Sequence, residues 1–376
     1  MVDGKTDTMV MDNFDSQVFL KDYWQQKPLV VRKAFQSPFW IEPNDLAGLA
    51  CEEEAEARII LQEQGKWQVE CGPFEEECFA NLPETAWTLL VQAVDHWVPE
   101  VQQILEHFNF LPRWRLDDIM VSYAPVGGTV SQHYDFFDVF LIQGEGKRQW
   151  QVGEVCGSRS EFLPDTPVRI LKEFNAMLDV TLEPGDMLYI PAKYSHLGVS
   201  LEDSLTYSVG FRAPSVRDVV DGIATQALET LREDDRYRDC DISLQANTGE
   251  VPERAIDQVQ AMLIAAMSDK ALVADWFCRY VTEKKYPEHD ALPELAENWK
   301  EQLQAGQHVY KNPASRFVYY GEQLFVDGDS AEVPKGLAQL LANASAVDPL
   351  FLADFVNSSA VENLINSGAL LLGYEE

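Results

Sequence analysis

Short apolar runs broken by glycine and proline dominate the middle of the chain. Between residues 117 and 212 the runs are DIMVSYAP, VFLIQGEGKRQWQVG, VTLEPGDMLYIP and SLTYSVGFRAP. Several short strands at such spacing are typical of a sandwich or a barrel. We therefore predict a β-rich barrel over this part of the chain.

The preceding segments mix helical and strand patterns. Residues 14–36 predict a helix that leads into a short strand, with Pro28 just before the apolar LVV run. Residues 58–73 predict a hairpin around the Gly65-Lys66 turn. Apolar positions in 85–108 recur at helical spacing, so we expect a helix there. Its apolar face would carry Leu89, Leu90, Val94, Trp97 and Val101.

After Pro214 the strand patterns stop and helical patterns take over. Residues 215–233 predict an amphipathic helix, and helical spacing continues through 253–283. Residues 316–333 predict a hairpin that turns at Asp327-Gly328, followed by helices over 335–343 and 348–366 and a closing strand over 369–375. Short helices combined with a hairpin indicate a small winged-helix-like module.

Composition limits the class of protein. The chain has 376 residues, and single cores rarely outgrow about 250 residues, so we expect two or three domains. No run approaches the roughly 18 apolar residues of a membrane helix, and the start lacks a secretory signal, so we expect a cytoplasmic protein. The six cysteines form no CxxC pair, which argues against disulfides and structural zinc.

The formal net charge is -33. Binding to phosphate backbones requires Lys and Arg, so nucleic acid is a poor partner for this surface. The same field attracts a basic protein or peptide. On charge alone, a basic macromolecular partner and an acidic surface that serves only solubility are both open. We expect no direct contact with nucleic acid and no membrane contact.

The stretch SQHYDFFDVF (131–140) places His133 and Asp135 two positions apart in an apolar run. In a strand these side chains project from one face, where a divalent metal would neutralise the carboxylate. A third ligand, His196, follows a Pro-Gly turn, an apolar strand and a proline in LEPGDMLYIPAKYSHLGVS (182–200). Two imidazoles and one carboxylate leave about three open positions, which suits non-haem Fe(II) better than zinc. The alternative is that all three residues are structural.

A second polar feature lies in GKRQWQVG (146–153). Strand alternation places Arg148 with Trp150 and Val152 on the apolar face. A buried guanidinium needs an anion, and its planar fork fits a carboxylate, so an external dicarboxylate is a reasonable partner. The alternative partner is an internal acid such as Asp117 or Asp118. Ser122, in DIMVSYAP, could bond the same carboxylate.

These residues resemble a known family. The HxD segment, the LEPGDMLYIP segment with its following histidine, and SLTYSVGFRAP are similar to JmjC-type ribosomal oxygenases of the cupin superfamily, close to bacterial 50S ribosomal protein arginine hydroxylases. The similarity extends to DYWQQKPLVVRKAF, GKWQVECGPF, TAWTLLVQAVDHW and the closing NSGALLLGYEE.

The resemblance implies an α+β chain built on a double-stranded β-helix (jelly roll). Residues 1–213 would form the catalytic JmjC/cupin domain, 214–298 a helical dimerisation region that makes a homodimer, and 299–376 a winged-helix-like domain. It also implies Fe(II) held by His133, Asp135 and His196, with 2-oxoglutarate as cosubstrate, its distal carboxylate on Arg148 and Ser122, and dioxygen as oxidant.

By the same resemblance, the substrate is an arginine side chain of a basic large-subunit ribosomal protein. Asp117, Asp118 and Asp138 are candidates to clasp that cation. Three other functions stay open at this point. They are hydroxylation of a ribosomal histidine or demethylation by the same fold, a non-catalytic assembly factor that binds ribosomal protein, and a DNA-binding winged helix, which the charge disfavours.

Overall fold

The computed structural model describes residues 11–63, 65–286, 298–344, 347 and 349–373. The chain divides into two compact units, residues 1–213 and 214–376. Each unit has its own buried apolar cluster. Among the described residues, no helix has both the length and the apolar character of a membrane span.

The first unit begins with short helices and an antiparallel hairpin, as the sequence predicts for 14–36 and 58–73. Asp15 caps the first helix by accepting hydrogen bonds from the backbone of Gln17 and Val18. The elements up to the barrel are α1 (Ser16–Asp22), β1 (Leu29–Val31), α2 (Pro43–Leu49), β2 (Ala57–Glu63), β3 (Lys66–Cys71), α3 (Glu76–Ala80), β4 (Trp87–Val91), η1 (Val94–His96), α4 (Pro99–Gln102), η2 (Gln103–Phe108) and η3 (Arg113–Arg115).

The predicted helix over 85–108 is wrong. Residues 87–91 form strand β4 between β2 and β5, and only short helical turns follow. Leu89 and Leu90 are both buried because the strand is covered on both faces, which gives a continuous apolar run that a helix can also show. Trp97, expected on the buried face, is 42% exposed.

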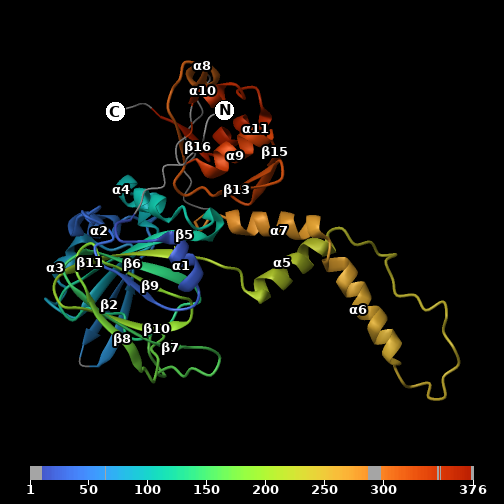
Figure 1. Ribbon diagram of the computed structural model, residues 1–376, viewed down its shortest axis with the longest axis horizontal. Helices are drawn as coiled ribbons and strands as arrows, with labels where there is room; N and C mark the ends of the chain where they lie inside the picture. The colour runs from blue at the N-terminus through green and yellow to red at the C-terminus, as the bar shows by residue number, and fades with distance from the viewer. Residues whose placement is uncertain (1–10, 64, 287–297, 345–346, 348, 374–376) are drawn as a thin grey trace. The chain divides into compact units, whose positions relative to one another are not determined.

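The rest of this unit is the predicted barrel (Figure 1). Its strands are β5 (Leu116–Ala124), β6 (Asp138–Glu145), β7 (Arg148–Val155), β8 (Ala176–Leu182), β9 (Met187–Ile190), β10 (Tyr194–Ser200) and β11 (Ser204–Phe211). An eight-stranded antiparallel sheet has the order β1-β9-β6-β11-β5-β4-β2-β3, and a three-stranded sheet has the order β10-β7-β8.

One apolar cluster lies between the two sheets, and a second lies on the opposite face of the large sheet. Leu141 and Leu188 of the large sheet pack with Trp150 and Leu182 of the small sheet, so these side chains fill the barrel. The opposite face of the large sheet packs against the N-terminal helices, with Phe19 of α1 as one of its fully buried rings. Inward positions of the strands therefore face the barrel interior, where polar side chains need a partner.

The second unit is mostly helical and contains two small sheets. Its helices are α5 (Val216–Leu228), α6 (Glu253–Met267), α7 (Lys270–Thr282), α8 (Trp299–Gln304), α9 (Lys335–Asn343), α10 (Pro349–Ala353) and α11 (Ser359–Asn366). Its strands are β12 (Val309–Lys311), β13 (Phe317–Tyr320), β14 (Gln323–Val326), β15 (Asp329–Glu332) and β16 (Leu370–Leu372). Strand β12 pairs with β16, and β13-β14-β15 form a meander.

Two predictions for this unit need correction. The segment 316–333 holds three strands instead of one hairpin, although the second turn does fall at Asp327-Gly328. The helix expected over 348–366 is two helices, α10 and α11. The predicted helix over 335–343 matches α9, and the strand expected over 369–375 is β16 in part, because residues 374–376 lie outside the described residues.

Candidate metal centre

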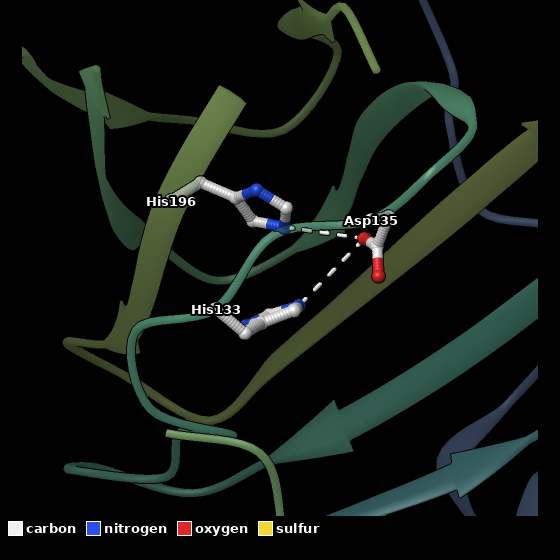
Figure 2. Close-up of side chains that lie close together, drawn as sticks. All are labelled: His133, Asp135 and His196. Atoms are coloured by element: carbon white, nitrogen blue, oxygen red, sulfur yellow. Dashed lines mark ion pairs between the residues drawn. The ribbon is translucent and has the colours of Figure 1, made fainter. Parts of the chain in front are cut away.

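Three side chains far apart in the sequence converge at one end of the barrel. One ligand atom from each of His133, Asp135 and His196 lies within 4.8 Å of the other two. One oxygen (Oδ2) of Asp135 is 3.5 Å from Nε2 of His196 and 3.7 Å from Nε2 of His133 (Figure 2). This is the only such cluster of potential metal ligands among the residues that the structure describes.

The backbone positions the two histidines directly. His133 and His196 form an isolated antiparallel bridge, in which each backbone amide donates to the other residue's carbonyl oxygen. The sequence predicted that His133 and Asp135 share a strand. That prediction is wrong, because both lie in the loop between β5 and β6, and only His133 makes a bridge.

The outer nitrogen of each imidazole is held by a main-chain carbonyl. His133 Nδ1 lies 2.9 Å from the carbonyl oxygen of Ser131, and His196 Nδ1 lies 3.0 Å from that of Tyr194. A carbonyl can only accept, so Nδ1 carries the proton and Nε2 presents its lone pair to the centre. This arrangement matches that of metal-binding histidines.

Burial keeps His196 neutral. Desolvation, reinforced by the neighbouring His133, lowers the pKa of His196 to about 4, against the opposing effect of Asp135. A neutral imidazole is the form that binds a metal. The Asp135 side chain is 49% exposed, so the centre is open on the side of the carboxylate.

The donor set fits a particular class of ion. Two imidazole nitrogens and one carboxylate oxygen on one side leave further positions for exchangeable ligands, which is the pattern of non-haem Fe(II) oxygenases. Structural zinc sites instead close a tetrahedron with four protein ligands. No fourth potential ligand joins the cluster within the described residues, so a closed site is disfavoured.

Arg148 is the first residue of β7 and is buried. Its guanidinium donates from Nη1 to Ser122 Oγ at 3.2 Å and lies 5.0 Å from the centre of the Trp150 ring. Burial lowers the pKa of Arg148 to about 10, so it remains charged at neutral pH. No carboxylate in the described part of the chain pairs with it, and Nε has no partner there. An external anion is the remaining partner for the charge.

The internal acids considered as partners for Arg148 are engaged elsewhere. Asp117 pairs with Arg212 at 3.2 Å, and Asp118 accepts from Gln92 at 3.2 Å. The sequence had left these two acids open as partners of the guanidinium, and the structure places neither beside it. Neither acid therefore neutralises the guanidinium, which leaves an external carboxylate as its partner.

Trp150 keeps its place because residue 198 on the neighbouring strand is glycine. Trp150 lies opposite Gly198, and a Cβ at position 198 would lie 2.7 Å from the indole ring. Contacts that short do not occur between real atoms, so any larger residue would displace the ring. Gly198 therefore maintains the aromatic surface on which the Arg148 guanidinium rests.

A cavity of about 570 Å³ opens beside the metal centre. His133 and Asp135 lie on its wall with the aromatic side chains Tyr134, Phe136 and Phe137. Its other lining residues include Asp117, Asp118, Asp138 and, from strands outside the metal centre, Arg58, Ile60 and Leu90. The aromatic wall and the contribution of β2 were not predicted from the sequence, although the YDFF run in 134–137 is a visible signal for the aromatic wall.

Asp138 differs from the other two cavity acids. It is almost fully buried and accepts from the Tyr189 hydroxyl at 2.6 Å, from Gln25 Nε2 at 3.0 Å and from Arg115 Nη2 at 3.0 Å. These three donors satisfy the carboxylate within the fold. Asp138 therefore anchors the start of β6, and its carboxylate is not available to a ligand.

Known proteins are similar to this chain over most of its length. Residues 103–219 match the model of the JmjC domain, and residues 265–370 match that of the ROXA-like winged helix. The ribosomal protein uL16 3-hydroxylase of Escherichia coli K12 is 34% identical over 367 residues, which cover 93% of this chain and 95% of that protein. A probable ribosomal oxygenase of Haemophilus influenzae is 43% identical over 224 residues, or 59% of this chain and 55% of that protein.

A solved structure is similar to nearly the whole chain. The ribosomal oxygenase YcfD from Escherichia coli, in complex with cobalt and 2-oxoglutarate, superposes with a TM-score of 0.86 at 32% identity, covering 97% of this chain and 99% of that one. The predicted JmjC cupin fold with a winged-helix domain is thus confirmed. The chain belongs to the JmjC-type ribosomal oxygenases.

Proposed function

We propose that this protein is an Fe(II)- and 2-oxoglutarate-dependent hydroxylase whose metal ligands are His133, Asp135 and His196. The observation that carries the proposal is the convergence of their ligand atoms within 4.8 Å. Each imidazole has its Nδ1 at a main-chain carbonyl oxygen, so Nε2 is the nitrogen that faces the centre. A solved relative in the same fold was studied with cobalt and 2-oxoglutarate, which supports the choice of cofactor and cosubstrate.

The cosubstrate would lie between the metal centre and Arg148. The guanidinium and the Ser122 hydroxyl would hold the distal carboxylate of 2-oxoglutarate, because a buried cation without an internal carboxylate requires an anion. The planar fork fits a carboxylate through two parallel hydrogen bonds. The 2-oxoacid end would then reach the open side of the metal centre.

When bound, iron and 2-oxoglutarate supply an oxidation by dioxygen that releases succinate and carbon dioxide and inserts one oxygen atom into a C–H bond. The chain itself contributes position. His133, Asp135 and His196 occupy one side of the centre and leave the other side to the reactants. The aromatic wall of the cavity would orient the substrate side chain.

The substrate we propose is an arginine side chain of a large-subunit ribosomal protein, as in the arginine hydroxylases that the sequence resembles. The relative that covers most of the chain is named for hydroxylation of uL16. Aromatic rings line the cavity, and their faces attract a guanidinium. Asp118, whose partner Gln92 is neutral, would supply the negative charge on the same wall. The net charge of -33 favours encounter with a basic protein.

A homodimer is also part of this proposal. Helix α6 has 15 residues and buries none of them in this chain. Its exposed apolar side chains are Ile256, Val259, Met262, Leu263 and Ile264. Exposed apolar surface of this kind marks an interaction site, and a second copy of the chain is the occupant we propose. The dimerisation region 214–298 and a cytoplasmic location remain predictions.

The test is hydroxylation of a basic substrate by the purified enzyme. Incubation with Fe(II), 2-oxoglutarate and a uL16 protein should release succinate and add the mass of one oxygen atom to an arginine-containing peptide. His133→Ala should abolish both products. Loss of a methylene group would instead indicate demethylation, modification of a histidine would redirect the substrate assignment, and equal succinate release from both proteins would favour a non-catalytic binder.

A further inference from the structure

Three buried polar atoms on the inner face of the barrel lack a hydrogen-bond partner within the described chain. They are the Thr88 hydroxyl, Nε of Arg148 and the indole N–H of Trp150. Buried polar groups in native proteins are nearly always satisfied, so each such atom calls for an explanation. Arg148 already has one in the proposed carboxylate. Thr88 has no role in the fold or in the site as described so far.

Thr88 faces the barrel interior. Along β4, Leu89 and Val91 pack into the cluster on the outer face of the large sheet, whereas Leu90 lines the cavity. Alternate residues of a strand share a face, so Thr88 points to the same side as Leu90. Its side chain is completely buried, with 0% exposure, and it is not among the residues that line the open cavity.

Strand register brings Thr88 close to Ser122. Strands β4 and β5 are antiparallel neighbours, with Leu90 opposite Ser122. Thr88 is therefore the diagonal neighbour of Ser122 on the same face, roughly 7 Å away. A carboxylate placed between two hydroxyls spans such a distance with a hydrogen bond of about 2.7 Å to each. Arg148 Nη1 reaches Ser122 from the opposite sheet.

We propose that Thr88 is a third donor to the distal carboxylate of 2-oxoglutarate, beside Arg148 and Ser122. The inference rests on the proposed function. It adds a residue that lies outside the sequence segments in which the metal ligands, Arg148 and Ser122 were identified. A carboxylate accepts about four hydrogen bonds. Two N–H groups of Arg148 and the two hydroxyls supply that number, and the bound anion in turn satisfies Nε of Arg148 and Oγ1 of Thr88.

The first experiment measures ligand binding without turnover. Protein loaded with Mn(II) in the absence of dioxygen is titrated calorimetrically with 2-oxoglutarate, as wild type, Thr88→Val and Thr88→Ser. Valine keeps the shape and removes the hydroxyl, and serine keeps the hydroxyl. We expect roughly tenfold to hundredfold weaker binding for Thr88→Val, the range of a hydrogen bond to a charged group, and binding within about threefold of wild type for Thr88→Ser.

A second ligand separates the distal carboxylate from the rest of the cosubstrate. The acid 2-oxopentanoate keeps the chain length and the 2-oxoacid group but lacks the distal carboxylate. It should bind wild type and Thr88→Val equally. An equal loss of affinity for both ligands would overturn the inference, because it would show a general disturbance of the pocket.

The third measurement uses the metal-free, ligand-free protein. Because the hydroxyl has no partner in that state, Thr88→Val should leave the thermal midpoint unchanged or raise it, while reducing the midpoint shift that 2-oxoglutarate causes in the Mn(II) form. A lower midpoint without ligand would overturn the inference by showing that the hydroxyl serves the fold. If wild type fails to bind 2-oxoglutarate, the proposed function itself fails. If wild type binds and Thr88→Val binds equally well, only the role of Thr88 fails.

Discussion

His133 and His196 are joined through their main chains by two hydrogen bonds, with N–O distances of 3.0 and 2.8 Å. The loop before β6 and strand β10 therefore cannot shift independently at this point. The carboxylate of Asp135 is the third member of the centre and has no comparable bridge. The backbone hydrogen bonds fix the two histidines relative to each other, and Asp135 contributes the negatively charged carboxylate of the centre.

Asp135→Asn should abolish tight metal binding without unfolding the protein. The substitution removes the anionic ligand, and the side chain is about half exposed, so the core is untouched. We expect Mn(II) affinity to fall by more than about a hundredfold. Mutation of residues that only orient a metal ligand typically lowers affinity by about tenfold to a hundredfold, and loss of a ligand should cost more. Calorimetric titration measures the affinity. Ser122→Ala is the control and should keep metal affinity, and equal affinity of Asp135→Asn and wild type would contradict the ligand assignment.

Replacing Arg148 should separate cosubstrate binding from stability. Arg148→Met removes a buried charge that lacks an internal carboxylate, so the ligand-free protein should be as stable as wild type or more stable in urea. The same variant should lose 2-oxoglutarate binding while Mn(II) binding persists. Arg148→Lys keeps the charge but not the planar fork, and we expect it to recover only part of the affinity. Strong destabilisation of Arg148→Met would reveal an internal partner.

Gly198→Ala should act through Trp150. A Cβ would lie 2.7 Å from the indole ring, so the ring must move. We expect a loss of about 1–3 kcal/mol in the free energy of unfolding, together with weaker 2-oxoglutarate binding because the Arg148 guanidinium loses its aromatic support. Denaturant titration and calorimetry measure the two effects. Gly157→Ala, which meets nothing within 4 Å, is the matched control and should change neither.

The metal-free protein should lose stability in mild acid because of His196. The unfolded chain binds a proton at this residue near pH 6.5, whereas the folded protein does so only near pH 4. Between these values the unfolded state holds more protons, so the free energy of unfolding falls as the pH falls. Urea titrations between about pH 4 and pH 7 should show a smaller acid loss in His196→Gln than in wild type. Identical slopes would contradict the burial of a neutral imidazole.

A charge on the apolar side of α6 should disrupt the proposed dimer. Leu263 is 59% exposed in the single chain, and Leu263→Lys would place an ammonium group in the interface. Light scattering should give the mass of two chains for wild type and of one chain for the variant. Ala261→Lys, on the other side of the same helix, is the control. A wild-type mass of one chain would refute the dimer.

Much of the barrel could be predicted from sequence because its strands are short, apolar and separated by turn residues. The exception was β4. Its TLLV run is buried on both faces of a sheet, and an apolar run without alternation is compatible with a helix as well as a strand. Only the neighbours β2 and β5, which no local pattern reveals, decide between the two.

The candidate site could be predicted in its residue types but not in its local structure. The HxD spacing suggested a strand, whereas Asp135 lies in a loop and His133 is held by a single bridge to a strand many residues away. The alternation of buried and exposed positions around Arg148 correctly predicted a buried guanidinium, because β7 is a regular strand there. Thr88 escaped notice because a lone threonine in a strand carries no signal until the register with Ser122 is known.

The wall of the cavity is divided between two sources. The proposed metal ligands lie on β10 (His196) and in the loop before β6 (His133 and Asp135), whereas Arg58 and Ile60 come from β2, which lies near one edge of the large sheet. Substitutions in β2 can therefore change which protein substrate is accepted without changing the proposed metal ligands. We therefore expect relatives to share the reaction and to differ in the protein that they modify.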